Sequence, residues 1–394
     1  MGQLIAFDMS VRSILNANIF DSNLNDFWAK GSLSWLKNII VDNSVPSSEI
    51  VDGYDYWLMP GFIDSHLHIC GESDTNKAKD YRYNEAEYIA IDRGIKNAKN
   101  CLRFGITSVR DMGNFERRGL KLKRYFEEKG VFAPRIYTSG NLITGVNGHA
   151  SDIGIGVRDK MLMFAVREEI SNNVDFIKII NDPLYFSFES IKNIVIYAKE
   201  NGKKVACHAY TPMGIKLAQA ANVNSIEHSG FLYDYGCKAV GETFIVPTCV
   251  AAKDVVNDPQ KALVGMDDAL LPTFKDWWVS LSSNVPKSIS QGISIGVGTD
   301  SGFPPTLFGQ SVWREMQILN KFGMPWAECY KAVTMINSKI IGDSRIGNLS
   351  VGSYADFIVF DSDPIVLGFD AIKSIVSVFI GGDCVYGVDL FKNY

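Results

Sequence analysis

Short apolar runs alternate with amphipathic stretches through the middle of this chain. The apolar runs predict eight buried strands, at Gly61–His68, Thr107–Asp111, Arg135–Gly140, Asp175–Ile180, Lys203–Tyr210, Ser225–His228, Phe244–Cys249 and Ser294–Asp300. The stretches between them predict helices at Glu85–Arg103, Gly119–Lys129, Asp159–Asn172, Ser187–Asn201 and Pro212–Ala220. Such alternation is typical of parallel strands joined by crossover helices. Eight such units over roughly 280 residues predict an α/β fold, a (β/α)8 TIM barrel.

The two ends of the chain have a different pattern. Both hold short β-type runs separated by Asn, Asp, Ser and Pro turns: Ser13–Phe20, Leu36–Val41, Ala355–Asp361 and Ile375–Ile380. Gly381-Gly382-Asp383 predicts a hairpin turn. Neither end has the apolar area to fold alone. We therefore expect residues 1–57 and 345–394 to form one small β-sandwich domain beside a catalytic barrel over residues 58–344.

Composition narrows the class of protein. The chain has 394 residues, 46% of them hydrophobic, and a net charge of −5, which argues against nucleic acid as a partner. No apolar run reaches the ~20 residues that span a bilayer, and the start, Met1–Ala6, does not have the pattern of a signal peptide. Seven cysteines without a CxxC pair indicate reduced thiols. We expect a soluble cytoplasmic protein.

The candidate chemistry lies at the ends of the predicted strands. The chain has only five histidines, and four of them, together with a lysine and an aspartate, fall where a barrel places its active site. These six candidate metal ligands are His66, His68, Lys178, His208, His228 and Asp300. His66 and His68 are two residues apart on one strand, so both side chains face the same side and can chelate one ion.

Lys178 needs a chemical explanation, because a lysine ammonium is a poor metal ligand. Burial lowers the pKa of an amine, and the neutral amine can react with CO2 to form a carbamate that bridges two ions. A zinc-like pair about 3.5–4 Å apart would activate a hydroxide and polarise a carbonyl group. Asp300 could bind metal, accept the proton of the attacking water and pass it to a leaving amine.

Each candidate also has an ordinary structural explanation. A single histidine such as His208 or His228 is often a hydrogen-bonded core residue, and an HxH pair alone is a weak signal. Lys178 could extend from a strand end to solvent, and Asp300 could cap a turn. Six such residues in this order, each at a strand end, favour the metal site.

The chain resembles the amidohydrolase superfamily of metal-dependent hydrolases. The most specific signature is Met59-Pro60-Gly61-Phe62-Ile63-Asp64-Ser65-His66-Leu67-His68. Further runs resemble the branch of imidazolonepropionase-like proteins and prolidase-like dipeptidases: Gly105–Gly113, Asp175–Ile179, His208–Tyr210, Gly298–Gly302 and, returning to the sandwich, Ile346–Phe360.

The resemblance implies a role for each residue. His66, His68 and Asp300 would hold a first zinc ion, His208 and His228 a second, and a carbamate on Lys178 would bridge them. Three residues outside the metal set would contact the substrate: His149, Tyr210 and Arg110. The alternatives are a loop histidine, a barrel aromatic residue and an internal salt bridge, respectively. Together with Asp300, His149 and Tyr210 are the candidate catalytic residues.

One position departs from the family pattern. Relatives often carry His-Gly a few residues after the last aspartate, where this chain has Phe308-Gly309. That departure weakens the transfer of substrate more than the transfer of metal. Specificity would depend on the loops that follow the strands, namely Gly71–Tyr83, Leu142–Arg158, Ala251–Trp278 and Ser301–Gly309, with Val255–Trp278 as a candidate lid. Trp277, Trp278 and Trp313, if exposed, would suit a homo-oligomer interface.

The sequence therefore predicts a binuclear zinc hydrolase of a small-molecule amide, a dipeptide or an N-acyl amino acid. Lys178 distinguishes this class from mononuclear deaminases and from imidazolonepropionase proper. Three alternatives stay open: a cyclic amide or lactone hydrolase, a non-catalytic binding protein built on the same barrel, and a phosphotriesterase-like hydrolase.

Overall fold

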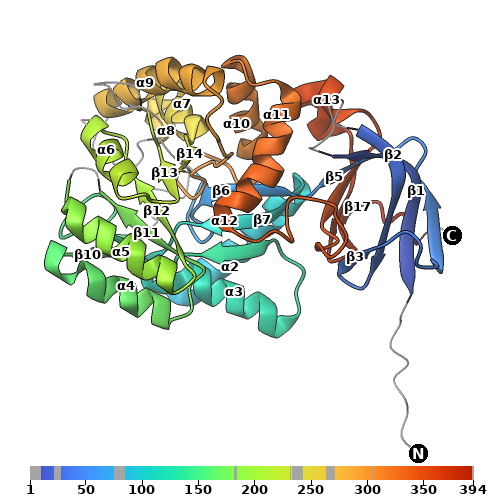
Figure 1. Cartoon of the computed structure of the whole chain (residues 1–394), viewed down its shortest axis with the longest axis horizontal. Coiled ribbons are helices and arrows are strands. Elements are labelled where there is room, and N and C mark those ends of the chain that lie inside the picture. Colours follow the sequence, from blue (N-terminus) through green and yellow to red (C-terminus); the bar gives the residue numbers. More distant parts are fainter. Residues whose placement is uncertain are drawn as a thin grey trace, which may run out of the picture.

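The chain forms two regions side by side, a helix-rich region and a terminal sheet (Figure 1). The computed structural model describes residues 10–21, 28–74, 85–181, 184–230, 232, 243–262, 271–303 and 305–392. The larger region holds the parallel strands and most helices. The smaller region is a sheet in which strands from both chain ends lie together.

The larger region contains two parallel sheets. One has the order β6-β7-β8, and the other β10-β9-β11-β12-β13-β14. Their strands are β6 (Phe62–Leu67), β7 (Ile106–Asp111), β8 (Arg135–Thr138), β9 (Leu142–Gly145), β10 (Ile155–Val157), β11 (Phe176–Ile180), β12 (Lys204–His208), β13 (Ser225–Glu227) and β14 (Phe244–Val246). Seven of the eight predicted strands are thus present, and β6, β7 and β11 are buried along their whole length. Parallel strands covered on both faces have this uniform burial.

The eighth predicted strand, Ser294–Asp300, is not a regular strand. It makes only isolated parallel bridges, Ile295 with Ile245 on one side and Ser301 with Leu67 on the other. Gly298 is the reason that this segment passes so close to β6, because a Cβ atom there would lie 2.7 Å from the Cβ of His66. The segment nevertheless connects the two sheets, since Gly296 N donates to Ile245 O and Ser65 N donates to Val297 O.

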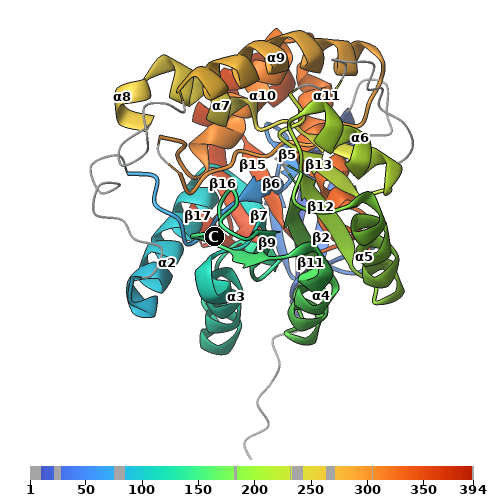
Figure 2. The same ribbon diagram turned by 90° about the vertical axis from the view of Figure 1, so that its left-hand side faces the viewer.

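Helices lie outside the strands (Figure 2). Those that follow the first parallel strands are α2 (Glu87–Arg103), α3 (Arg118–Lys129), α4 (Leu162–Ser171), α5 (Phe188–Glu200) and α6 (Pro212–Ala220). The later ones are α7 (Cys249–Asn257), α8 (Pro259–Ala262), α9 (Leu271–Ser290), α10 (Gln310–Lys321), α11 (Trp326–Lys331), α12 (Asn337–Ile341) and α13 (Pro364–Leu367). All five predicted helices are present, and α4 begins after a short 3-10 turn at Asp159–Met161. Ser187 and Thr211 cap α5 and α6 with their side chains, which explains where these helices begin.

Both chain ends share one eight-stranded sheet of order β17-β16-β15-β5-β1-β2-β3, with β4 also paired to β1. Its strands are β1 (Val11–Phe20), β2 (Trp28–Leu36), β3 (Ile39–Val41), β4 (Glu49–Asp52), β5 (Trp57–Pro60), β15 (Phe357–Phe360), β16 (Ile375–Ile380) and β17 (Asp383–Gly387). A separate apolar cluster that includes Ile14, Trp35, Phe357 and Phe379 is its core.

Two tight turns set where strands of this sheet end. The predicted strand Leu36–Val41 is wrong, because the chain turns at Lys37, whose φ is 54°, and residues 36 and 39 pair across the turn. The predicted turn at Gly381-Gly382 is present. Both glycines have positive φ, and Ile380 pairs with Asp383. Two positive φ values in a two-residue loop are what a tight hairpin needs.

A network of side chains joins the sheet to the parallel strands. Arg135 at the start of β8 forms a bidentate ion pair with Asp356, at 2.6 and 2.9 Å. The Arg135 guanidinium also lies over the ring of Tyr354 at 3.6 Å. The Asp356 side chain is 3% exposed and that of Arg135 is 24% exposed, so the pair is partly buried, and its two parallel hydrogen bonds fix its geometry.

The described parts of the segment Val255–Trp278 are helical except at Asp258, and residues 263–270 lie outside the described part. Its expected role as a lid stays a prediction. Two of the three tryptophans expected at an interface are not exposed, since Trp277 and Trp313 are 9% and 0% accessible. In the described part of the chain, no helix combines the length and apolar character that crossing a bilayer requires.

Candidate metal centre

All five histidines of the chain converge in one row at the carboxyl ends of the parallel strands. The ring centroids of neighbouring members are 6.0 Å apart for His68 and His66, 4.6 Å for His66 and His228, 4.5 Å for His228 and His208, and 4.9 Å for His208 and His149. The first four are buried, and His149 lies at the exposed end of the row. The sequence predicts four of them as metal ligands, and the structure brings those four together.

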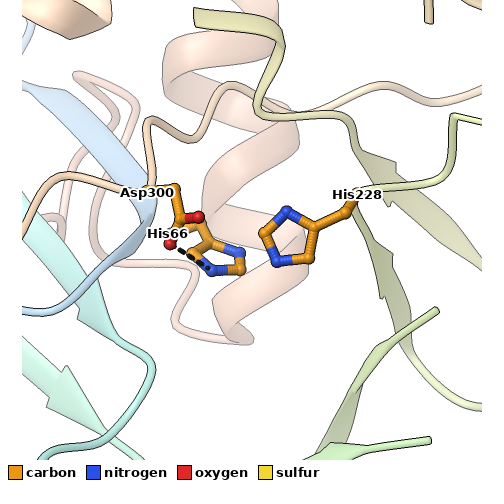
Figure 3. A group of neighbouring side chains, drawn as sticks. All are labelled: His66, His228 and Asp300. Atoms are coloured by element: carbon orange, nitrogen blue, oxygen red, sulfur yellow. Dashed lines mark ion pairs between the residues drawn. The ribbon is translucent and has the colours of Figure 1, made fainter. Parts of the chain in front are cut away.

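The Asp300 carboxylate lies beside His66 and His68 in this row of histidines. Its Oδ1 atom lies 3.3 Å from His66 Nε2 and 3.5 Å from His68 Nε2. His66, His228 and Asp300 offer ligand atoms within 4.8 Å of one another, the spacing of a group that can hold a metal ion (Figure 3). This trio includes His228, which the sequence assigned to the second ion, so the two predicted ligand sets adjoin each other.

Two of these ligands have an unusual backbone conformation. His228 has φ 65° and Asp300 has φ 58°, the left-handed region that non-glycine residues rarely occupy. His228 directly follows the last paired residue of β13, and Asp300 directly precedes Ser301, which bridges to Leu67. Such conformations cost about 1–3 kcal/mol each and persist where surrounding structure enforces them, typically at functional sites.

Hydrogen bonds fix the orientation of three imidazoles. His66 Nδ1 lies 2.8 Å from Glu227, His68 Nδ1 lies 2.7 Å from the carbonyl of Gly113, and His228 Nδ1 lies 2.7 Å from Thr248 Oγ1. A carboxylate and a carbonyl only accept, and the Thr248 hydroxyl already donates to Pro247 O, so Nδ1 is the protonated nitrogen in each ring. The lone pair of Nε2 then faces the centre, as in metal-binding histidines.

Two further groups face the centre without a partner. Lys178 Nζ and His208 Nε2 are buried and have no hydrogen-bond partner among the described residues. Burial lowers the pKa of Lys178 to about 8, against attraction from Glu227 and Asp300. Burial also holds the pKa values of His208 and His228 well below the usual range, so both imidazoles are neutral. Neutral imidazole and a deprotonated amine are the forms that metal chemistry requires.

These donors fit a divalent metal centre, and sequence comparison gives the family. The profile of the amidohydrolase family matches residues 57–385. The chain belongs to the amidohydrolase family. It is 24% identical over 384 residues to ochratoxinase from Aspergillus niger, covering 84% of this chain and 76% of the relative. It is 26% identical over 361 residues to imidazolonepropionase from Fusobacterium nucleatum, covering 82% of this chain and 81% of the relative.

Solved structures support the same fold for this amidohydrolase. A Xaa-Pro dipeptidase with methionine bound in its active site superposes with a TM-score of 0.84 at 24% identity, over 96% of this chain and all of the other. The predicted family and the predicted branch are confirmed. The protein is a metal-dependent amide hydrolase with a mixed α/β fold.

Arg110 of the amidohydrolase is an internal residue. It is 2% exposed, and its guanidinium donates to Ser65 O, Ser225 Oγ and Glu227 Oε1. The expected contact with a substrate carboxylate is therefore corrected to the alternative, an internal salt bridge. The Arg110 side chain fixes Glu227, which in turn orients His66.

Sequence reasoning missed Glu227 and Thr248, the partners that orient two ligands. Burial would raise the pKa of the Glu227 carboxyl, but Arg110 and His66 together lower that pKa below its ordinary range. Glu227 precedes His228 in the chain yet serves His66, so only the fold reveals the pairing. A possible signal was the charge itself, because a glutamate inside a predicted buried strand needs a buried partner.

The remaining candidates occupy the rim. The ring of Tyr210 lies 5.6 Å from that of His208, and the ring of His149 lies 4.9 Å from it. Phe308, where relatives often carry histidine, is 4% exposed and packs in the main apolar core of the amidohydrolase. That position therefore contributes packing here.

Proposed function

We propose that this amidohydrolase is a binuclear zinc hydrolase that cleaves the C–N bond of a dipeptide or an N-acyl amino acid. The observation that carries the proposal is Lys178, whose buried amine has no hydrogen-bond partner in the described ranges of the chain and faces the same centre as the histidine row. A buried polar group without a partner costs about 1–3 kcal/mol, so its retention calls for a ligand that compensates.

The proposed centre uses all six predicted ligands. His66, His68 and Asp300 would hold one ion, and His208 and His228 would hold the other. The neutral Lys178 amine would form a bond to the carbon of CO2 and release a proton, and the resulting carbamate would be a further ligand. Bound divalent ions would supply an activated water and withdraw charge from the substrate carbonyl.

The protein supplies proton transfer and substrate orientation. Burial alone would raise the pKa of Asp300, but the neighbouring His66 and His68 side chains hold that pKa well below its ordinary range, so the group is an ionised carboxylate. Its side chain is 20% exposed and can reach a bound substrate. Tyr210 and His149, whose rings both neighbour that of His208, would contact the scissile amide. Asp300 then delivers the proton to the departing amine.

A cyclic amide or lactone hydrolase is the second candidate, favoured by the likeness to imidazolonepropionase. It would use the same centre, so a substrate panel separates the two. If the protein binds metal but hydrolyses no amide, a non-catalytic binding protein would be favoured. Hydrolysis of an organophosphate alone would favour a phosphotriesterase-like enzyme.

The proposal includes the architecture. The two parallel sheets with the segment Ser294–Asp300 form a closed (β/α)8 barrel over residues 58–344, and residues 1–57 with 345–394 form a β-sandwich domain. In support, Asp175 N donates to Thr138 O where the two sheets adjoin. A cytoplasmic location and a homo-oligomer complete the proposal.

The test is metal content in protein grown with zinc and bicarbonate. The wild type should hold about two zinc ions, in line with a bridged pair, and should hydrolyse members of a dipeptide panel. Lys178→Ala should lose metal and activity together. Lys203→Ala, which removes a lysine just before the start of β12, is the control and should match wild type. One ion or fewer in wild type and in Lys178→Ala alike would rule out the carbamate bridge.

A further inference from the structure

Two hydrogen bonds hold the backbone of His149. Its N–H donates to the Tyr185 hydroxyl at 3.0 Å, and its carbonyl accepts from Thr144 Oγ1 at 2.9 Å. The chain thus anchors both polar groups of a residue that is itself exposed at the rim. An exposed loop residue seldom has this much support unless its position matters.

The ring of Tyr185 lies directly on the loop that carries His149. A Cβ atom on Gly145 would lie 2.3 Å from Tyr185 Cδ1, and one on Gly148 would lie 2.7 Å from Tyr185 Cζ. Side chains at these two positions would push the ring away. The two glycines of Gly145-Val146-Asn147-Gly148-His149 therefore let an aromatic ring pack against backbone.

Tyr185 is tied in turn to the metal centre. Its N–H donates to Asn181 Oδ1 at 3.2 Å, and Asn181 N donates to the carbonyl of His208 at 3.1 Å. Asn181 is completely buried. Because the rings of His149 and His208 lie 4.9 Å apart, the contacts form a closed circuit from His208 through Asn181 and Tyr185 to His149.

We propose that Tyr185 is a positioning residue that holds His149 against His208 and so sets how the substrate is bound. The proposal rests on the proposed function, in which His149 contacts the substrate. Tyr185 itself acts only through the His149 backbone. Removing its hydroxyl should leave the metal centre intact and weaken substrate binding.

The first measurement is a double-mutant cycle with Tyr185→Phe and His149→Ala, using zinc-loaded protein and a dipeptide substrate. Tyr185→Phe should raise KM about tenfold, the size expected from one lost hydrogen bond, with kcat and zinc content near wild type. The double variant should be no worse than His149→Ala alone, because the two residues act as one unit. Additive losses would overturn the proposal. Tyr197→Phe, which removes a tyrosine hydroxyl on α5 outside this circuit, is the matched control and should behave as wild type.

The second measurement does not depend on activity. Selective 15N-histidine labelling gives one backbone amide signal for each of the five histidines, and His149→Ala identifies its own. Tyr185→Phe should shift the His149 amide signal and speed its hydrogen exchange, while the signals of His66 and His68 stay in place. An unchanged His149 signal would overturn the proposal. If wild type hydrolyses no amide, the proposed function fails, and the labelling experiment still decides the role of Tyr185.

Discussion

His66 and Lys178 are buried side chains that face the same centre, yet the protein holds them differently. The Nδ1 atom of His66 is fixed by Glu227, whose carboxylate is itself held by Arg110 and Ser225. Lys178 Nζ has no hydrogen-bond partner in the described part of the chain. His228 resembles His66, because Thr248 fixes its Nδ1.

The difference separates two ways of making a ligand. On the His66 side, outer contacts fix the geometry before any ion arrives, which lowers the cost of binding. On the Lys178 side, the folded protein bears the cost of a buried polar group, and the ligand or modification relieves it. Substitutions on the two sides should therefore change the stability of metal-free protein in opposite directions.

The largest effect on stability and on zinc affinity should come from the anchored side, the ligands His66 and His228 whose Nδ1 atoms are fixed by hydrogen bonds. Glu227→Gln keeps the shape of the side chain but leaves the Arg110 guanidinium as an uncompensated buried charge. We expect metal-free protein to lose about 3–5 kcal/mol of unfolding free energy. Zinc affinity should fall about 10–100-fold, because His66 loses its oriented partner. Urea unfolding and zinc titration with a competing chelator measure both quantities.

The control for that variant is Glu168→Gln. Glu168 also pairs with an arginine, Arg117, but its side chain is 47% exposed. An exposed pair contributes about 0–1 kcal/mol. Equal losses in the two variants would remove the distinction between an anchoring carboxylate and a surface one.

A substitution on the unanchored side, that of Lys178, should change the stability of metal-free protein in the opposite direction. Lys178→Met replaces the buried amine with an apolar side chain of similar length, so metal-free protein should gain about 1–3 kcal/mol of stability. The stability of wild type relative to the variant should also rise between about pH 8 and 10.5. The pKa of Lys178 is about 8 when folded and 10.5 when unfolded, so the unfolded wild-type chain binds more protons at this residue in that window. The variant lacks this contribution, whereas the titration of all other groups is common to both proteins.

Chelator-treated protein, unfolded in urea at pH 7.5, 9 and 10.5, gives the comparison. A variant less stable than wild type at pH 7.5 would mean that Lys178 contributes to the metal-free fold. The unanchored side would then be no different from the anchored one.

The smallest effect should come from the hydroxyl that orients His228. Thr248→Val keeps the branched shape at a residue with φ 50° but removes the acceptor of the His228 N–H. We expect a loss of about 1 kcal/mol of stability and about tenfold in zinc affinity. Thr248→Ser keeps the hydroxyl and should bind zinc as wild type does. Equal affinities for the valine and serine variants would show that the hydroxyl has no orienting role.

The ligands and the residues that support them differ in how well the sequence predicts them. The ligands follow apolar runs, and the carboxyl ends of parallel strands meet at one edge, so His66, His208, His228 and Asp300 could be placed together from periodicity alone. The eighth strand escaped prediction in its detail, because its short bridges to two neighbours depend on how closely Gly298 approaches β6.

The supporting residues could not be found in this way. Glu227 orients His66, which lies on a strand distant in the sequence. Thr248 orients His228, which lies at the carboxyl end of β13. Tyr185 supports the loop of His149, which precedes it in the chain. These pairings are contacts between segments that only the folded chain brings together. Arg110 was open to two interpretations for the same reason, since its partner is set by the fold and not by its neighbours in sequence.

The terminal sheet has a consequence for how the protein is made. Strand β5 pairs directly with β15, with Pro60 opposite Phe357, so the edge of β5 stays uncovered while the ribosome makes everything between them. An uncovered strand edge is a template for pairing with other chains. The nascent protein must keep that edge from other nascent chains until its last strands emerge. A translation stop before residue 357 would release a product with an open edge and a tendency to aggregate.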